Sequence, residues 1–155
     1  MPKHVLAKLE AELKDLRHAL LVEIPKEIGA AASQGDLSEN AEYEQALSKR
    51  DMFQAKVVAM EKRISEIASL DITRLPRNKV AYGTRVTLLD LDSEKEVTYR
   101  LVLPEELGGE SELLSISSPI GMALVGLEEG AEVRIKIPAG TKRFEVLELT
   151  TIHDQ

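Results

Sequence analysis

The chain has no cysteine, only five aromatic side chains, and fewer basic than acidic groups. Without cysteine there is no disulfide, no thiolate zinc site and no cysteine nucleophile, a composition that fits a reducing cytosol. The 20 Lys and Arg residues face 27 Asp and Glu residues, so the formal net charge is −7. A protein that binds nucleic acid by itself needs clustered basic groups and aromatic stacking partners. The composition therefore argues against a stand-alone nucleic-acid binder.

Long apolar runs are also lacking. No stretch approaches the roughly 20 residues of a membrane span, and the N-terminus has no signal-peptide core. We therefore expect a cytoplasmic protein with no membrane partner. The three histidines are scattered, and no P-loop, dinucleotide-binding fingerprint or serine elbow is present. The sequence thus predicts no self-contained active site, and we expect that the protein is not an enzyme.

Two apolar stripes with helical spacing fill the first half of the chain. Steps of three and four residues separate Leu6, Leu9, Leu13, Leu16, Leu20, Ile24 and Ile28. A second stripe with the same steps consists of Tyr43, Ala46, Arg50, Phe53, Val57, Met60, Ile64 and Ile67. This spacing is typical of coiled-coil seams. We expect residues 1–74 to form an antiparallel α-helical coiled-coil hairpin, with a second helix over residues 37–70 that is about 50 Å long.

A proline interrupts the first of these stripes. Pro25 removes one backbone N–H donor, and its ring clashes with the preceding turn of a helix. We therefore expect a kink or a helix break at this position. The stripe continues beyond it to Ile28, so the hairpin itself is expected to survive.

From residue 75 the pattern changes to short alternating segments separated by Gly, Pro, Asp and Ser. Strands are predicted over residues 84–91, 97–103, 113–117, 133–137 and 143–150. Ser118 and Pro119 are residue types that favour an N-cap and a first helical position, so a short helix is expected through Leu124. The expected domain, residues 75–155, is β-rich, and the fold class is α+β.

The link between the two predicted helices is acidic. Four carboxylates fall in nine residues, at Asp36, Glu39, Glu42 and Glu44. Helix capping explains part of this pattern, because Asp36 is a good N-cap type and Glu39 stands at the capping-box position. Capping does not explain Glu42, whose charge repels that of Glu39. Carboxylates three residues apart on a helix can also share Mg²⁺ weakly, with a partner supplying the remaining ligands.

Two motifs resemble a known protein family. Residues 35–43, Gly-Asp-Leu-Ser-Glu-Asn-Ala-Glu-Tyr, resemble the tip signature of the bacterial GreA/GreB transcript cleavage factors. Residues 115–126 resemble the C-terminal Ser-Pro-Ile-Gly motif of this family, and the Pro-Ala-Gly turn at residues 138–140 fits as well. The resemblance covers nearly the whole chain in the right order and is closest to GreA.

The resemblance implies that the coiled coil enters the secondary channel of RNA polymerase, while an FKBP-like C-terminal domain docks at the rim. Asp36 and Glu39 match the catalytic, metal-assisting acids, which help to hold Mg²⁺ shared with the polymerase active site during cleavage of backtracked RNA. No metal is expected to bind the isolated protein stably. The expected partners are RNA polymerase and, only within the elongation complex, the nascent RNA 3′ end and DNA. The protein is expected to be a monomer.

Further residues match the partner-binding positions of the family. The supporting positions of the tip are matched by Ser38, Asn40 and Tyr43. The polymerase-docking loop is matched by Ser117, Ser118 and Pro119. Structural roles remain open for some of them, because Tyr43 also lies on the apolar stripe and because helix capping alone would explain Ser118 and Pro119.

One departure from the family keeps other hypotheses open. Ala32 and Leu47 stand where GreA-like members usually carry basic residues near the tip, although Lys49 and Arg50 follow slightly later. An alternative is therefore a channel-binding regulator or inhibitor of RNA polymerase that does not stimulate cleavage. A third hypothesis is a prolyl isomerase or holdase, suggested by the FKBP-like domain. Five aromatic side chains in the whole chain leave little for an aromatic-lined proline pocket.

Overall fold

The computed structural model describes residues 2–33 and 40–155. The chain divides into two compact units, residues 1–71 and 72–155, and each is described by itself. The expected domains, residues 1–74 and 75–155, stay a prediction about which parts fold independently. Within the described residues, no helix combines the length and the apolar character needed to cross a membrane.

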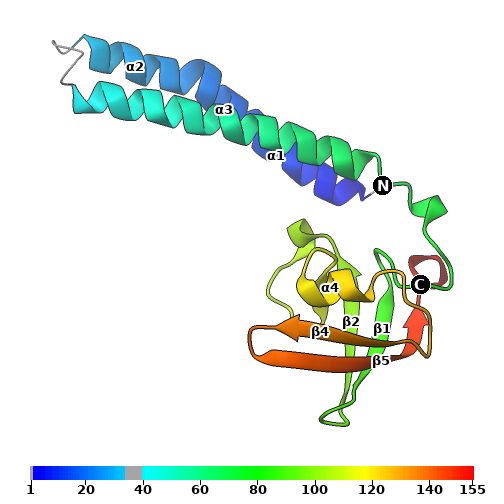
Figure 1. Cartoon of the computed structure of the whole chain (residues 1–155). Coiled ribbons are helices and arrows are strands. Elements are labelled where there is room, and N and C mark those ends of the chain that lie inside the picture. The colour runs from blue at the N-terminus through cyan, green and yellow to red at the C-terminus, as the bar shows by residue number, and fades with distance from the viewer. Residues whose placement is uncertain (1, 34–39) are drawn as a thin grey trace. The chain divides into compact units, whose positions relative to one another are not determined.

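The first unit consists of helices that run side by side (Figure 1). These are α1 (Lys3–His18), α2 (Ile24–Ala32) and α3 (Ala41–Ala68). Arg17 near the end of α1 pairs with Glu61 at 3.0 Å, whereas Glu27 in α2 pairs with Lys49 at 3.0 Å. The earlier residue, Arg17, pairs with the later position in α3, and the later residue, Glu27, pairs with the earlier one. Helix α3 therefore runs antiparallel to α1 and α2. Members of both predicted stripes are buried, among them Leu6, Leu9, Leu13, Ile24, Ala46, Val57 and Ile67. Coiled-coil supercoiling stays a prediction.

The run of helices is distorted in the turn directly before Pro25. Residues Ala19–Glu23 form a π-helical turn, in which the N–H of Ile24 donates to the carbonyl of Ala19 five residues earlier. Pro25 occupies the first turn of α2 and has no N–H to offer. The widened turn accommodates the proline ring without ending the run of helices, which is the usual effect of a π-bulge. The expected helix break is absent, since α2 follows the π-helical turn directly, and a kink at Pro25 stays a prediction.

The predicted start of the second helix was wrong. Helix α3 begins at Ala41, and its N-cap is Asn40, whose backbone is extended at φ −83° and ψ 100°. The expected cap residues, Asp36 and Glu39, lie outside the described residues, and Asn40 provides the cap of this helix. The helix has 28 residues instead of the expected 34, which makes it about 42 Å long.

The second unit is built on one mixed sheet of five strands (Figure 1). Its strands are β1 (Arg85–Asp90), β2 (Glu96–Val102), β3 (Leu113–Ser115), β4 (Glu132–Ile137) and β5 (Gly140–Thr150). Their order is β3-β2-β1-β5-β4, and only β2 and β3 run parallel. All five predicted strands are present, with shifted ends, so the α+β class is confirmed. The FKBP-like topology stays a prediction.

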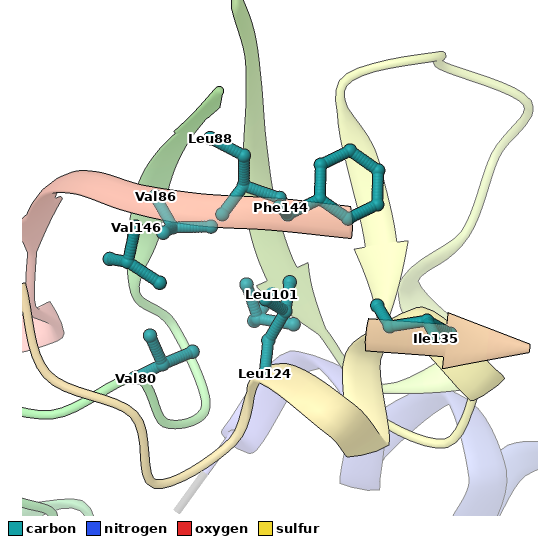
Figure 2. Close-up of a cluster of buried hydrophobic side chains, with 8 residues drawn as sticks. All are labelled: Val80, Val86, Leu88, Leu101, Leu124, Ile135, Phe144 and Val146. Carbon is teal, nitrogen blue, oxygen red and sulfur yellow. The ribbon is translucent and has the colours of Figure 1, made fainter. Parts of the chain in front are cut away.

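One face of the sheet carries the core, shown in Figure 2. Alternate residues of the strands point to this face, as the two-residue period of a strand requires. Helix α4 (Pro119–Leu124) contributes Leu124, which is 0% exposed. The buried cluster consists of Val80, Val86, Leu88, Leu101, Leu124, Ile135, Phe144 and Val146. Burying one such side chain completely stabilises the fold by about 1.5–3 kcal/mol, so the cluster fixes α4 against the sheet.

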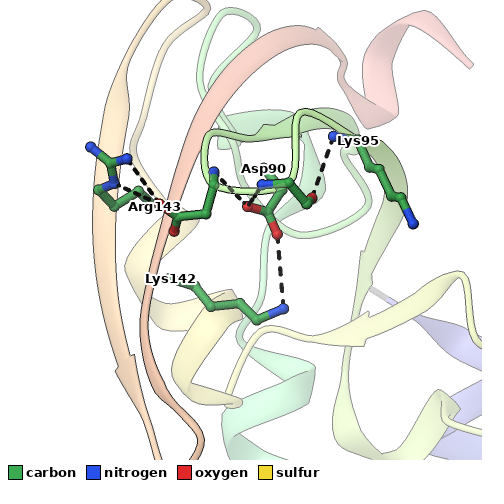
Figure 3. A network of polar contacts seen from close by, with 6 residues as sticks. Asp90, Lys95, Lys142 and Arg143 are labelled. Carbon is green, nitrogen blue, oxygen red and sulfur yellow. Dashed lines mark hydrogen bonds and ion pairs between the residues drawn. The ribbon is translucent and has the colours of Figure 1, made fainter.

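A polar network closes the turn between β1 and β2 (Figure 3). The Asp90 carboxylate accepts hydrogen bonds from the backbone N–H groups of Asp92 at 2.9 Å and Ser93 at 3.2 Å. These bonds lower the pKa of Asp90, the bond from Asp92 being the largest cause. Glu94 has a φ of +59°, which completes the reversal of the chain. The last carboxylate of β1 therefore holds the turn that leads to β2.

Gly121 in α4 lies against the backbone of the preceding loop. A Cβ atom at this position would lie 2.0 Å from the carbonyl oxygen of Ser115. A backbone carbonyl cannot move aside as a flexible side chain could, so only glycine permits this approach. The close contact sets how near α4 lies to the end of β3.

We expect Gly121→Ala to destabilise the second unit, because the new methyl group forces α4 away from Ser115. The expected loss is about 2–3 kcal/mol, as for overpacked sites. Thermal unfolding of the full chain should show a melting transition lowered by roughly 10 °C. The control is Gly29→Ala in α2, where the new methyl group would meet nothing within 4 Å. That variant should be unchanged or more stable, and equal behaviour of the two variants would contradict the close contact.

Candidate functional site

The residues predicted at the acidic tip fall partly outside the described structure. Asp36, Ser38 and Glu39 lie outside the described residues, so their catalytic, metal-binding and partner-binding roles stay predictions. Asn40 and Tyr43 are described and half-buried. Among the described residues, no group of three or more His, Asp or Glu side chains could hold a metal ion. This finding does not extend to Asp36 and Glu39.

The side chain of Asn40 connects the two helices that flank the tip. Its Oδ1 atom accepts a hydrogen bond from the N–H of Tyr43 at 3.1 Å, which caps α3. Its Nδ2 atom donates to the carbonyl of Ala31 at 2.6 Å, in the last turn of α2. One amide therefore satisfies a donor at the start of α3 and also bonds to a carbonyl at the end of α2. The sequence analysis assigned Asn40 to partner binding and missed this structural role, although asparagine is among the preferred N-cap residues.

Negative charge continues from the tip into the first turn of α3. Glu42 and Glu44 are exposed there, where the helix macrodipole favours carboxylates. The backbone of Tyr43 takes part in the cap, and its half-buried position is compatible with packing on the apolar seam. A direct contact of Tyr43 with a partner stays a prediction.

The basic groups that follow the tip are each engaged with an acid. Lys49 lies 3.0 Å from Glu27 of α2, and Arg50 lies 3.4 Å from Asp51. Lys49 also stands 5.8 Å from the ring centre of Phe53, within the range of a cation–π contact. These partners reduce the positive charge that Lys49 and Arg50 can offer in place of the basic residues missing at Ala32 and Leu47.

The predicted docking loop is held by hydrogen bonds at the start of α4. The Ser118 hydroxyl accepts from the N–H of Gly121 at 3.0 Å and donates to the carbonyl of Ser115 at 2.7 Å. The prediction that Ser118 caps the helix and that Pro119 opens it is confirmed. Ser117 contributes its backbone N–H to the Ser115 hydroxyl at 3.0 Å, and its side chain is exposed.

An exposed apolar strip continues from this loop along α4. Met122 is 62% exposed, and Val125, at the end of the helix, is 46% exposed. Pro119 is exposed one turn before Met122, so these side chains follow the spacing of one helix face. We call Ser117, Pro119, Met122 and Val125 the α4 face. The sequence analysis missed Met122 and Val125. Their spacing of three residues from Pro119 and from each other, which is visible in the sequence, could have indicated a shared helix face.

Both units match models of one protein family. Residues 1–68 match the family described as "Transcription elongation factor, N-terminal", and residues 75–151 match "Transcription elongation factor, GreA/GreB, C-term". The chain belongs to the GreA/GreB family of transcription elongation factors. Together the two models cover most of the chain, including the tip segment and the docking loop.

Individual relatives agree with this assignment. Transcription elongation factor GreA of Helicobacter hepaticus is 41% identical over 149 residues, covering 96% of this chain and 91% of the relative. GreA of Desulfotalea psychrophila is 39% identical over 144 residues, covering 93% and 89%. A crystal structure of GreA factor homolog 1 (Gfh1) of Thermus thermophilus covers 93% of both chains with 22% identity and a TM-score of 0.42, a value too low to support an argument. The relatives confirm a GreA-type elongation factor and do not favour the alternative regulator.

The role of Asn40 can be separated into its two hydrogen bonds. Asn40→Ala removes the cap and the bond to Ala31, and we expect it to destabilise the first unit by about 1–2 kcal/mol. Asn40→Ser keeps a capping oxygen but is too short to reach Ala31, so its loss should be smaller. Urea unfolding followed by circular dichroism measures both variants. If Asn40→Ser were as stable as the unchanged chain, the bond between the helices would contribute nothing.

Proposed function

We propose that this elongation factor stimulates the intrinsic cleavage of backtracked nascent RNA by RNA polymerase. The observation that carries the proposal is the presence of the acidic segment 36–44 in a chain whose two units both match GreA/GreB models. The paired helices of the first unit enter the secondary channel of the polymerase and bring this segment to its active site. The factor donates groups to the polymerase and is not an enzyme by itself.

Asp36 and Glu39 supply the chemistry at the tip in this proposal. Carboxylate oxygens are the hard ligands that Mg²⁺ prefers, so the donor set fits this ion. Two carboxylates hold it weakly, which is why the polymerase has to supply the other ligands and the isolated protein binds no Mg²⁺ stably. In phosphodiester hydrolysis the bound ions activate water and stabilise the leaving oxygen. The two acids of this chain would position the shared ion, and Asn40 would fix the start of the helix that follows them.

The length of the first unit supports insertion into a deep channel. Helix α3 is about 42 Å long and is paired along its length with α1 and α2. An isolated amphipathic helix of this composition would be marginally stable, and the buried seam provides the missing stability. The paired helices can therefore carry a charged end into a confined space without unfolding.

The α4 face is the proposed docking surface at the rim of the channel. Its exposed Met122 and Val125 offer apolar area, and the loop at Ser117 is held rigidly by the bonds among Ser115, Ser118 and Gly121. Rigid apolar anchors next to polar groups are typical of protein interfaces. The factor would act as a cytoplasmic monomer and meet the RNA 3′ end and DNA only inside the elongation complex.

The metal role of the tip predicts that Asp36→Asn abolishes stimulated cleavage while binding to the polymerase survives. The substitution removes a ligand charge with little change in size, and the cap of α3 is unaffected because Asn40 provides it. Cleavage of RNA in stalled, backtracked complexes measures activity, and co-sedimentation with core polymerase measures binding. Glu42→Gln, which removes one charge from the exposed first turn of α3, is the matched control and should retain activity. Equal cleavage by Asp36→Asn and the unchanged chain would reject the metal role.

The docking role predicts that Ser117→Glu weakens binding to core polymerase, because it places a charge in the contact. The expected loss of affinity is about tenfold, which corresponds to roughly 1.4 kcal/mol of binding free energy. The Ser117 side chain is exposed and only its backbone N–H bonds within the loop, so the fold should be unaffected. Fluorescence titration of core polymerase measures the affinity. Ser111→Glu, at another exposed loop position of the same unit, is the control for added charge. If both variants bind as the unchanged chain does, the docking surface lies elsewhere.

A further inference from the structure

The sheet of the second unit contains two pairs of arginines that face each other across neighbouring strands. Arg85 of β1 is the partner of Arg100 in β2, and Arg134 of β4 is the partner of Arg143 in β5. Residues directly opposite each other in an antiparallel pair project to the same face of the sheet, and like charges at such positions are destabilising. All four side chains are exposed, and a negative group between the members of a pair would lower their repulsion.

The chain supplies this group for one of the pairs. Arg143 binds the carboxylate of Asp92 through its Nη2 atom at 2.9 Å and its Nε atom at 3.3 Å (Figure 3). The turn between β1 and β2 places Asp92 there, next to the network around Asp90. The repulsion between Arg134 and Arg143 is thus relieved within the protein.

Arg85 and Arg100 have no such carboxylate partner among the described residues. Within residues 2–33 and 40–155, no ion pair involves either guanidinium group. The N–H of Leu101 donates to the carbonyl of Thr84 at 2.9 Å. This bond joins the residues next to Arg85 and Arg100, so the two arginines themselves form a non-hydrogen-bonded pair. Side chains are closer in such pairs than in hydrogen-bonded ones. Arg85 and Arg100, which have no ion-pair partner in the described parts of the chain, therefore lie at the shorter of the two distances that separate opposed residues in an antiparallel sheet.

Both arginines line a hollow in the surface of the second unit. Thr98, Glu112 and Leu113 contribute to the same hollow. Glu112 is the one carboxylate among the lining residues, and it lies beyond ion-pair distance of both guanidinium groups. Two positive charges against one negative charge leave an excess of positive charge in this hollow, in a chain whose net charge is −7.

We propose that the Arg85–Arg100 pair is a binding site for a phosphate group. A guanidinium fork matches two oxygens of an oxyanion, and two forks on one face can together engage the three terminal oxygens of a phosphate. A single carboxylate has one charge and two oxygens, which one arginine already satisfies. The phosphate can belong to a free diphosphate or to the end of a nucleic-acid strand. This inference rests on the sheet alone and does not depend on the proposed function.

The test uses the full chain and inorganic pyrophosphate as the probe. Nuclear magnetic resonance of the arginine Nε–Hε groups follows a titration at constant ionic strength, because free salt screens exposed charges. The signals of Arg85 and Arg100 should shift and saturate together, and those of Arg134 and Arg143 should shift little. Arg85→Gln or Arg100→Gln should weaken the affinity by roughly tenfold, the worth of one charge-assisted hydrogen bond. Arg134→Gln is the matched control and should bind within about twofold of the unchanged chain.

A second readout distinguishes loss of binding from loss of fold. Removing one of two opposed charges relieves repulsion, so Arg85→Gln should melt at or above the temperature of the unchanged chain. Pyrophosphate should raise the melting temperature of the unchanged chain but not of Arg85→Gln. A short DNA strand with a 5′-phosphate, compared with the same strand lacking it, assigns the phosphate to a nucleic-acid end if only the former saturates the signals. If neither probe gives a saturable shift, or if Arg134→Gln weakens binding as much as Arg85→Gln, the proposal is wrong.

Discussion

Burial of one aliphatic face by another holds both units of this protein together. In the first unit, α1 and α2 cover the seam of α3, and in the second unit α4 covers one face of the sheet. Phe144 is the one aromatic residue in the buried cluster of the sheet, so the packing depends on branched aliphatic side chains. None of these faces would be stable if exposed, because most helix stability in proteins comes from tertiary packing of an apolar face. The tip and the docking loop are positioned by elements that exist only because of this burial.

A few polar side chains fix the positions at which the packed helices begin. Asn40 joins the end of α2 to the start of α3, and Ser118 joins the start of α4 to the loop after β3. In both places one short side chain satisfies a donor at the start of a helix and bonds to a carbonyl at the end of the preceding element. Buried main-chain groups without partners are costly, so these bonds specify where each helix begins. The residues that we propose to contact RNA polymerase lie beside these two anchors.

Much of the architecture followed from local pattern. The alternation of apolar residues located all five strands, and the steps of three and four residues located the buried side chains of the helices. The cap at Ser118 was predictable as well, because it depends on neighbours within one helical turn. The start of α3 was missed because Asp36, Glu39 and Asn40 are all acceptable near a helix N-terminus. Choosing among them requires the carbonyl of Ala31, which belongs to another helix.

The sequence by itself determined the change of hydrophobic period near residue 75, the acidic segment 36–44 and the motifs that indicated the GreA/GreB family. These features are local, since a period or a cap depends on residues a few positions apart. Tertiary structure alone decided that Asn40 bonds to Ala31, that Met122 is exposed while Leu124 is buried, and that Arg85 faces Arg100. Such partners depend on helix pairing and strand register. A shift of one residue in register would move every side chain of a strand to the other face, so only the folded chain brings these groups together.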